Sequence, residues 1–213
     1  MGIFDPILLW WHRGKVRGKM DRVFSRGRDP YGYDGRSAYE TQRLDAMAQA
    51  VGFHRFADAL EVGCAEGAFT ERLAACADRL TAVDISTVAL SRAKERLKGK
   101  AGVDFVEADV REWSPPAGRR YGLIVLGDVL YYIDKPMVRD IFEKTFPRIS
   151  SWLEPGGRLM LAHAFVGPKE LAHRTGFRER FETQGLKLVS EAPVGAEAGP
   201  VRCLISVLES VRK

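Results

Sequence analysis

The residues best placed for chemistry are two acids and two glycines that follow short apolar runs. Glu61, Gly63 and Gly67 stand in the segment Leu60–Ala68, and Asp84 closes the next apolar run. This order is typical of a strand, a glycine turn, a helix and a second strand that ends in a carboxylate. A carboxylate at that position can accept hydrogen bonds from both hydroxyls of a ribose. The arrangement therefore predicts a site for a nucleoside-containing cofactor.

The spacing of the glycines distinguishes two classes of cofactor. Gly63 and Gly67 have no β-carbon, so their turn can adopt unusual dihedral angles and expose bare backbone to a ligand. Dinucleotide pyrophosphates are bound by Gly-x-Gly-x-x-Gly, whereas this loop has three residues between its glycines. S-adenosylmethionine (SAM) carries a sulfonium and an amino-acid tail in place of a pyrophosphate, and the wider loop suits it better. The pattern favours a methyltransferase over a dehydrogenase, with a plain strand-to-helix turn as the alternative explanation.

Apolar periodicity places these residues in alternating strands and helices. Helices are expected at 37–51, after residue 67, near 89–98, at 134–153 with a bend at Pro147, and at 168–184. Strands are expected around residue 60 and at 79–84, 103–110, 121–126, 158–165, 186–190 and 201–208. This order predicts an α/β, Rossmann-like fold: a mostly parallel seven-stranded sheet with helices on both faces and an antiparallel last strand.

Length and cysteine content limit the class of protein further. With 213 residues and 46% hydrophobic content, the chain can bury one substantial core without a second globular domain. Cys64, Cys76 and Cys203 have no close pairing and no metal-type spacing. We therefore expect neither a disulfide framework nor a zinc site, and a reducing compartment, hence a cytoplasmic location.

The positive charge of the chain is concentrated near its start. Residues 11–28 contain seven basic residues against one acid, more than the net charge of +5 of the whole chain. The apolar patch at 7–11 is too short for a membrane span and lacks the flanks of a signal peptide. This basic aromatic arm, residues 1–36, can rest on anionic lipid in a peripheral membrane contact or hold an acidic substrate. Gly14 and Gly18 weaken the case for one continuous helix, so a solvated or packing arm is favoured.

Several segments together resemble a known family. Residues 60–71 resemble the first motif of the NodS-like nodulation N-methyltransferases, within the class I SAM-dependent methyltransferases. Residues 123–132 and 153–157 match that family further along, and 39–43 resembles its aromatic-Glu-x-x-Arg segment. The similarity covers roughly residues 37–165, and it implies a methyltransferase domain over 37–213.

Two features depart from the family pattern. Gly127-Asp128 stands where the nodulation enzymes have a small residue and a glutamate, and the basic segment before Tyr31 has no counterpart in them. The motifs are thus specific for the class of reaction and much less specific for the substrate.

The resemblance implies how the turn and the strand ends contact SAM. By this resemblance, the glycine turn would contact the methionine end of the cofactor. The acids that follow the second and third strands would contact its adenosine. The backbone of Gly127 is implied near the sulfonium. The remaining implied contacts are Glu61, Gly63, Cys64 and Ala65 at the turn, Asp84 and Ile85 at the ribose and adenine, and Asp109 and Val110 at the adenine edge.

Two upstream residues complete the predicted cofactor site. Arg43 suits the carboxylate of the cofactor through charge-assisted hydrogen bonds, and Tyr39 belongs to the same segment. The alternative for Arg43 is a solvated charge on a helix. For Asp109 the alternative is a turn-forming residue at a strand end.

Methyl transfer from a sulfonium is an in-line displacement, which mainly requires alignment of a neutral lone pair with the methyl group. Asp128, at the end of the fourth strand, is the leading candidate to take a proton from an amine acceptor. Tyr131 or Tyr132 can orient the acceptor through its hydroxyl, unless the ring fills core space. His163 is a second candidate base, with a buried, hydrogen-bonded role as the favoured alternative. The other histidines lack partners at ligand spacing, which predicts no metal.

Three classes of function fit these residues to different degrees. We expect methylation of an amine or hydroxyl of a small molecule, with nitrogen favoured. The expected acceptors are amino sugars, glycolipids and natural products, including sugar- or lipid-linked molecules. A nucleic-acid methyltransferase is the first alternative, because the basic arm could contact phosphate groups. However, the fourth strand does not end in an Asn/Asp-Pro-Pro-aromatic motif that grips a flipped base. A non-catalytic nucleotide-binding module is the second alternative, weakened by the absence of Gly-x-Gly-x-x-Gly.

Overall fold

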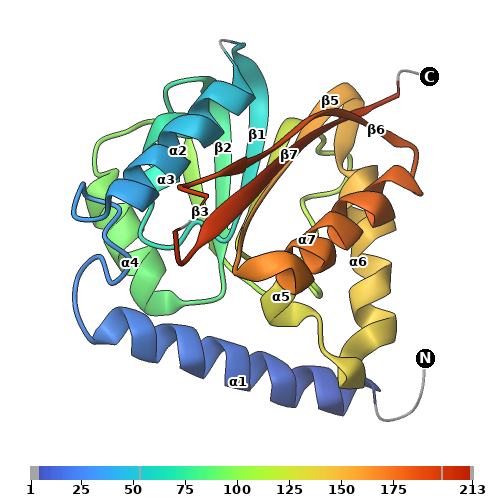
Figure 1. Ribbon diagram of the computed structural model, residues 1–213, viewed down its shortest axis with the longest axis horizontal. Coiled ribbons are helices and arrows are strands. Elements are labelled where there is room, and N and C mark those ends of the chain that lie inside the picture. Colours follow the sequence, from blue (N-terminus) through green and yellow to red (C-terminus); the bar gives the residue numbers. More distant parts are fainter. Residues whose placement is uncertain (1–4, 53, 198, 212–213) are drawn as a thin grey trace.

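One mixed sheet runs through the middle of the computed structural model (Figure 1). Within residues 5–52, 54–197 and 199–211, which the structure describes, seven strands pair in the order β3-β2-β1-β4-β5-β7-β6. The first five strands are parallel, and β7 is antiparallel to both of its neighbours. The expected fold class is confirmed. The strands are β1 (Phe56–Val62), β2 (Ala77–Asp84), β3 (Val103–Glu107), β4 (Tyr121–Gly127), β5 (Leu153–Phe165), β6 (Leu186–Val194) and β7 (Arg202–Ser210).

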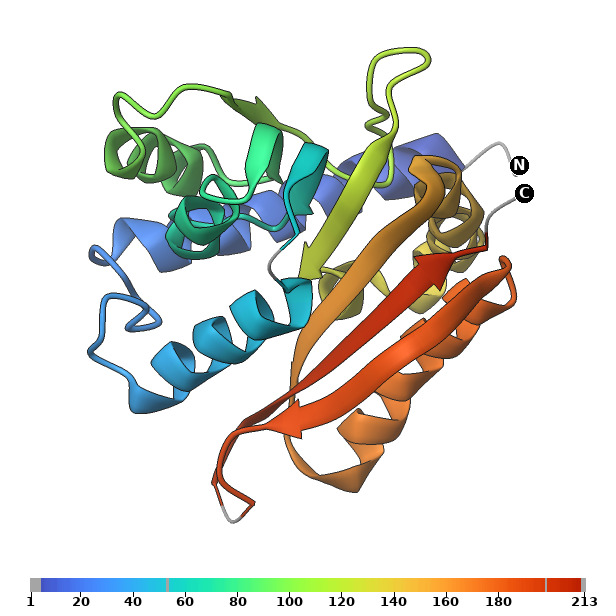
Figure 2. The ribbon, with the colours of Figure 1, turned by 90° about the horizontal axis from the view of Figure 1, so that it is seen from above.

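Helices cover both faces of the sheet, as Figure 2 shows. On one face, α2 and α3 pack against side chains such as Leu123 and Val125 of β4. On the other, α6 and α7 pack against Ile124 and Leu126 of the same strand. This alternation explains why β4 is an almost unbroken apolar run, since both of its faces are buried. The helices are α1 (Asp5–Ser25), α2 (Ala38–Val51), α3 (Ala68–Leu73), α4 (Thr87–Arg96), α5 (Leu130–Ile133), α6 (Arg139–Ser151) and α7 (Gly167–Glu182).

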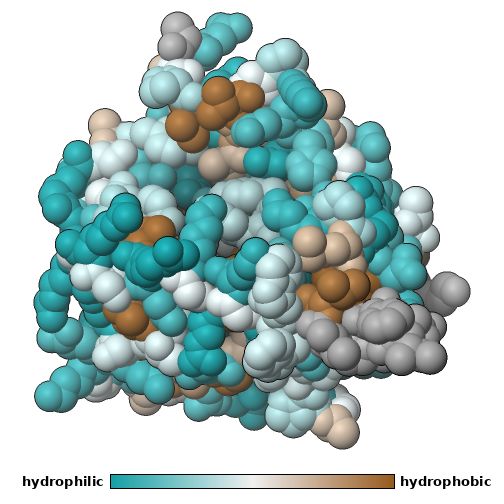
Figure 3. Space-filling view, turned by 90° about the horizontal axis from the view of Figure 1, so that it is seen from below, coloured by the Kyte–Doolittle hydropathy of each residue, from teal (hydrophilic) through white to brown (hydrophobic). Residues whose placement is uncertain are grey.

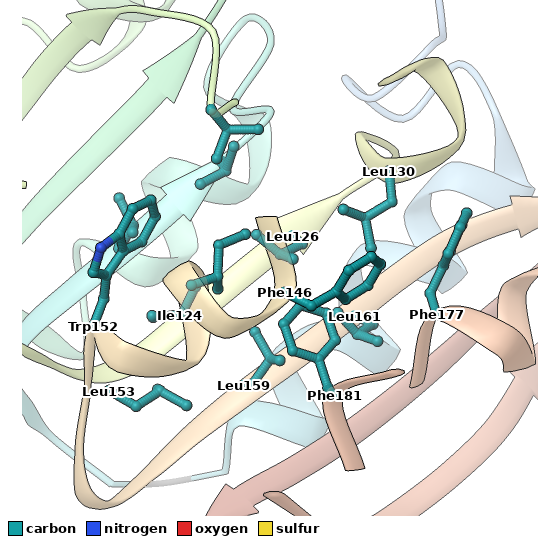
Figure 4. Close-up of a cluster of buried hydrophobic side chains, with 14 of the residues drawn as sticks. Ile124, Leu126, Leu130, Phe146, Trp152, Leu153, Leu159, Leu161, Phe177 and Phe181 are labelled. Atoms are coloured by element: carbon teal, nitrogen blue, oxygen red, sulfur yellow. The ribbon is translucent and has the colours of Figure 1, made fainter. Parts of the chain in front are cut away.

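The larger apolar cluster is rich in aromatic rings (Figure 4). Phe146 of α6 lies edge-on to Phe181 of α7, with ring centroids 4.9 Å apart. Phe142 extends this contact to Phe177 with a centroid distance of 6.0 Å. These rings join the two helices to each other and to β4 and β5, so the carboxyl ends of those strands are held on a rigid base.

The region around residues 134–153 differs from the expected single bent helix. The chain forms α5, a short 3-10 turn η1 (Pro136–Val138) and then α6, which continues through Pro147. Proline removes one helical hydrogen bond, and the buried stripe of Phe142, Phe146 and Ile149 offsets that loss. The helix ends at Ser151, and β5 begins earlier than expected, at Leu153.

The basic N-terminal segment also differs from the expectation. It forms one continuous helix, α1, which runs through both of its glycines along the lower edge of the molecule in Figure 1. Leu9, His12, Met20 and Phe24 are buried on one stripe of this helix. Their packing outweighs the low helix propensity of glycine, which costs about 1 kcal/mol per residue. Neither α1 nor any other helix in the described ranges combines the length and apolar character needed to cross a bilayer.

Candidate functional site

A cavity of about 370 Å³ lies at the carboxyl ends of β1, β2 and β4, beneath α1. Its floor is the backbone of the strand ends, and Val16, Met20 and Phe24 of α1 form its roof. Open parallel sheets bind ligands in this position, where the strand order reverses. The sheet order confirms the reversal, because β1 lies between β2 and β4.

The glycine turn after β1 has a left-handed backbone. Gly63, Ala65 and Gly67 have φ angles of 85°, 47° and 82°. A β-carbon on Gly63 would collide with the carbonyl oxygen of Gly127, and one on Gly67 would lie 2.9 Å from Leu97 Cδ1. Both glycines are therefore required by close packing of the chain against itself. Ala65 adopts the same strained region without that freedom, and such strain often marks a functional turn.

Asp84 lies directly opposite this turn, at the end of β2. Its Oδ2 accepts a hydrogen bond of 2.9 Å from the backbone N–H of Ala65, and its Oδ1 accepts one of 2.8 Å from Ser86. Burial raises the pKa of Asp84, and these backbone N–H groups partly counter that rise. Asp84 lines the cavity, and each of its carboxylate oxygens can accept a further hydrogen bond.

A buried ion pair joins α2 to the end of β4. Arg43 Nη2 lies 2.7 Å from Asp128 Oδ2, and Arg43 Nη1 lies 3.1 Å from Glu40 Oε2. Both Arg43 and Glu40 are buried, and both line the cavity with Asp128. The Nε atom of Arg43 has no hydrogen-bond partner, and neither does the buried hydroxyl of Tyr39. Both residues line the cavity, and an unpaired buried donor suits a ligand that carries acceptors, such as a carboxylate.

Asp128 also accepts a backbone hydrogen bond and has a strained backbone conformation. Its Oδ1 accepts a hydrogen bond of 2.7 Å from the backbone N–H of Ala164, and its φ of 51° is the second strained non-glycine angle in the cavity wall. Burial alone would raise the pKa of Asp128, but the guanidinium of Arg43, the hydrogen bond from Ala164 and other nearby groups together lower it. The carboxylate is therefore ionised at neutral pH, which makes it a good hydrogen-bond acceptor and a weak base.

Tyrosine rings form much of the remaining wall. Tyr31, Tyr33, Tyr131 and Tyr132 line the cavity with Tyr39. The rings of Tyr131 and Tyr132 lie 4.6 Å apart, and those of Tyr31 and Tyr33 lie 5.6 Å apart. Burial raises the pKa of Tyr31, Tyr33, Tyr39 and Tyr131, so these hydroxyls stay protonated and act as hydrogen-bond donors at neutral pH.

Asp109 lines the cavity, but its carboxylate is occupied. Arg111 Nε and Nη2 donate to its two oxygens at 3.0 and 2.5 Å. Arg111 Nη1 lies 2.6 Å from Nδ1 of His12, which is buried on the inner side of α1. Burial and the nearby guanidinium lower the pKa of His12. Asp109 thus anchors α1 to the sheet through Arg111.

The structure brings eleven of the fourteen predicted site residues to the cavity. They are Tyr39, Arg43, Gly63, Ala65, Asp84, Ile85, Asp109, Val110, Gly127, Asp128 and Tyr132.

The other three predicted residues, Glu61, Cys64 and His163, are not among the lining residues. Glu61 accepts a hydrogen bond of 2.6 Å from Thr70 Oγ1 in α3, and burial raises its pKa to about 7. Cys64 is buried in a small apolar cluster behind the turn.

His163 is enclosed in the core beside Phe177. Its Nε2 accepts a hydrogen bond of 3.3 Å from the backbone N–H of Leu130, and burial lowers its pKa to about 3. The ring is neutral at physiological pH, and its acceptor nitrogen is already used. This environment fits the buried, hydrogen-bonded alternative better than a base.

The sequence suggested that the basic arm closes over the cofactor, but it did not identify the individual residues that α1 and the turn after it contribute. Met20, Phe24, Tyr31 and Tyr33 all line the cavity, as does Glu40. A signal was present, because Val16, Met20 and Phe24 recur every fourth residue within the basic segment. That spacing is typical of one apolar face of a helix.

Comparison with known proteins identifies relatives for most of this chain. The family model described as Nodulation protein S matches residues 19–166. Nodulation protein S of Sinorhizobium fredii strain NGR234 is 35% identical over 138 residues, which cover 64% of this chain and 61% of that protein. Nodulation protein S of Bradyrhizobium diazoefficiens strain USDA 110 is 35% identical over 161 residues, covering 73% and 70%. The chain thus spans less than two thirds of the Sinorhizobium relative.

Solved structures show the same fold. The N-methyltransferase NodS of Bradyrhizobium japonicum WM9, crystallised with S-adenosyl-L-homocysteine, superposes with a TM-score of 0.76 at 24% identity, covering 92% of this chain and 98% of that one. Magnesium protoporphyrin IX methyltransferase of Synechocystis PCC 6803, with bound SAM, gives a TM-score of 0.66 at 19% identity, covering 95% and 97%. The expected Rossmann-like methyltransferase fold is confirmed.

Proposed function

This chain belongs to the nodulation protein S (NodS) family, and from that premise we propose that it transfers a methyl group from SAM to an amine of a small molecule. The observation that carries the proposal is the juxtaposition in one cavity of Asp84, Arg43 and Asp128. The first is an acceptor for ribose hydroxyls, the second holds an unused donor, and the third is an ionised carboxylate.

The residues present fit SAM along its length. Asp84 has acceptor capacity for the ribose hydroxyls, and the apolar side chains of Ile85 and Val110 suit the adenine ring. The unpartnered Nε of Arg43 and the hydroxyl of Tyr39 suit the carboxylate of the methionine portion. When bound, SAM supplies an electrophilic methyl group on a positively charged sulfur. Asp109 contributes by anchoring Arg111 and α1, because its own carboxylate is already paired.

The cavity favours an amine over a hydroxyl acceptor. A hydroxyl group must lose its proton during attack, which requires a base of matched strength. Among the described lining residues, Asp128 has a lowered pKa, and the buried tyrosines hold their protons. Burial raises the pKa values of Glu40 and Asp84, but Glu40 is paired with Arg43, and Asp84 accepts backbone hydrogen bonds and is assigned to the ribose. His163 is enclosed behind the wall with a pKa of about 3. A neutral amine needs no such base, because its lone pair is already free to attack.

Asp128 and Tyr132 orient the acceptor in this proposal. The ionised carboxylate of Asp128 accepts a hydrogen bond from an amine N–H and directs the lone pair into the cavity. It also stabilises the positive charge that the nitrogen gains on methylation, because charge of opposite sign lies nearby. Tyr132 adds a hydroxyl at the same wall.

The tyrosine-lined wall supports an amino sugar, a glycolipid or a related natural product as the acceptor. Tyrosine offers an apolar ring face and a polar tip in one side chain. Tyr31 and Tyr33 therefore suit a ring that carries both C–H and O–H groups. This acceptor class is the finer part of the proposal.

Two experiments test the proposal in order. Calorimetric titration with S-adenosylhomocysteine and with NAD should show binding of the first and none of the second. Methyl-labelled SAM should then be incubated with the protein and a panel of amino sugars, glycolipids and phenols. We expect label on the nitrogen of an amine. Labelling of phenols alone, or tighter binding of NAD, would overturn the assignment.

A further inference from the structure

The outer face of α1 is a solvent-exposed strip that takes no part in the cavity. It consists of the exposed residues Trp10, Trp11, Gly14, Lys15 and Arg22, together with the half-buried Gly18. Trp10 and Trp11 are 65% and 43% exposed. The cavity roof uses the opposite side of the same helix, where Val16, Met20 and Phe24 point inward. Figure 3 views the molecule from the α1 side and shows a largely hydrophilic surface with small, separate hydrophobic patches.

Packing within the protein does not account for the residues of this outer face. A β-carbon added to Gly14 or Gly18 would meet nothing within 4 Å, so neither glycine serves a close internal contact. The ammonium of Lys15 lies 3.4 Å from the centroid of the Trp11 ring, and this contact is itself on the surface. Two exposed indoles and two helix-weakening glycines are costly features for a face that only meets water.

The charge of the outer face has one sign. Lys15 and Arg22 are its charged members. Asp21, at the edge of the strip, accepts a hydrogen bond from Ser86 Oγ and lies 3.9 Å from Arg17, so its charge is already engaged. The ion pairs of α1 lie on its flanks, where Arg13 meets Glu112 and Arg17 meets Glu107. Just beyond the helix end, Arg26 is exposed and adds to the same charge. The strip therefore presents uncompensated positive charge, among the described residues, beside two indole rings.

We propose that the outer face of α1 docks on an anionic lipid bilayer, with the helix lying in the plane of the interface. Indole rings settle at the headgroup level of a membrane, and each nearby Lys or Arg is attracted by anionic lipid. The two glycines leave the helix backbone bare along this strip, so it can lie close to a flat surface. The helix stays on the surface and does not span.

Charge complementarity selects this partner over a second copy of the chain. An antiparallel pair of α1 helices would bring Lys15 and Arg22 of both copies together, and like charges in contact oppose association. A nucleic acid also offers negative charge. However, its phosphates do not require the paired exposed indoles at one end of the strip, whereas a lipid interface uses them directly.

Docking has a consequence for the cavity. Because a helix with its side chains is about 10 Å thick, the cavity roof would lie about that distance from the lipid headgroups. An acceptor with a lipid tail could then reach the site while its tail stays in the membrane. This consequence rests on the proposed function, whereas the docking itself does not.

Co-sedimentation of the full chain with vesicles tests the docking. Vesicles of phosphatidylcholine mixed with phosphatidylglycerol should bind the protein, and vesicles of phosphatidylcholine alone should bind it much less. Two double variants address the two halves of the strip: Trp10→Ser with Trp11→Ser, and Lys15→Gln with Arg22→Gln. Each double variant should lower the constant for binding to these vesicles by about tenfold.

The control is a variant with the same loss of charge elsewhere, Lys169→Gln with Lys187→Gln, both exposed on α7 and β6. It should bind like the unaltered chain, and all variants should keep their affinity for S-adenosylhomocysteine. Equal losses in the α1 and control variants would overturn the proposal, since net charge alone would then explain binding. Retention on an oligonucleotide with no binding to vesicles, or dimers that form through α1, would also overturn it. If the unaltered chain does not bind S-adenosylhomocysteine at all, only the proposed function is contradicted.

Discussion

Arg43 Nη2 lies 2.7 Å from Asp128 Oδ2, and this buried ion pair joins the helix before β1 to the end of β4. It places an ionised carboxylate in the cavity wall and leaves the Nε of Arg43 without a partner. In the function we propose, this one pair relates the two halves of the site, with Arg43 assigned to the cofactor carboxylate and Asp128 to the acceptor.

Replacement of Asp84 by alanine should weaken cofactor binding. The variant loses the acceptor for both ribose hydroxyls, and a buried donor left unpaired costs about 1–3 kcal/mol. We expect the dissociation constant for S-adenosylhomocysteine, measured by calorimetry, to rise at least about tenfold. Asp78→Ala is the matched control, since Asp78 lies on the same strand with its side chain 56% exposed. Unchanged affinity in the Asp84 variant would refute its assignment.

Asp128→Asn should separate binding from turnover. The amide keeps the shape of the side chain but loses the charge that orients and stabilises the reacting amine. We expect kcat to fall about tenfold or more, with cofactor affinity nearly unchanged. Asp140→Asn, at an exposed position of α6, should leave both quantities unaltered. Equal turnover in the two variants would remove Asp128 from the mechanism.

Gly63→Ala should destabilise the fold. Its φ is 85°, and a β-carbon would collide with the carbonyl oxygen of Gly127. Strain and overlap together should cost roughly 2–5 kcal/mol in the free energy of unfolding, measured with urea. Gly14→Ala is the contrasting change, because its β-carbon meets nothing within 4 Å. It should stabilise α1 by roughly 0.5–1 kcal/mol. A Gly63 variant as stable as the unaltered chain would show that the turn can relax.

The free energy of unfolding should depend on pH through His163. Burial lowers the pKa of His163 to about 3 in the folded chain. As the pH falls below 6.5, this histidine is therefore protonated in the unfolded chain before it is protonated in the folded chain. Its contribution is complete above pH 6.5 and decreases toward pH 3, by about 1.4 kcal/mol per pH unit at most. Urea unfolding of the unaltered chain and of His163→Gln over this range isolates the effect, because other groups cancel in the difference.

The exposed His54→Gln change provides the control for that comparison. It should not reproduce the change in pH dependence that His163→Gln causes. A difference between the unaltered chain and His163→Gln that stays constant from pH 6.5 to pH 4 would contradict the buried, neutral state of His163.

The sequence predicted the sheet well because its central strands are buried on both faces. Runs such as Leu123–Leu126 are apolar throughout. The expectation failed where tertiary packing overrides local preference. Gly14 and Gly18 suggested a break, yet the inward packing of Met20 and Phe24 keeps α1 helical.

The part of the site that could be predicted is the part formed by residues close together in the sequence. Gly63, Ala65 and Asp84 follow strands in a recognisable order, and the structure places all three at the cavity. The pairing of Arg43 with Asp128 joins distant parts of the chain, so no local pattern indicates it. The same holds for the contact of His12 with Arg111, which ties the roof of the cavity to the end of β3.

A crystal structure of the chain grown with S-adenosylhomocysteine tests the central claim most directly. We predict density for the ligand in the cavity, with its ribose hydroxyls on Asp84 and its carboxylate on the Nε of Arg43. A ligand held elsewhere, or a cavity without it at saturating concentration, would contradict the account.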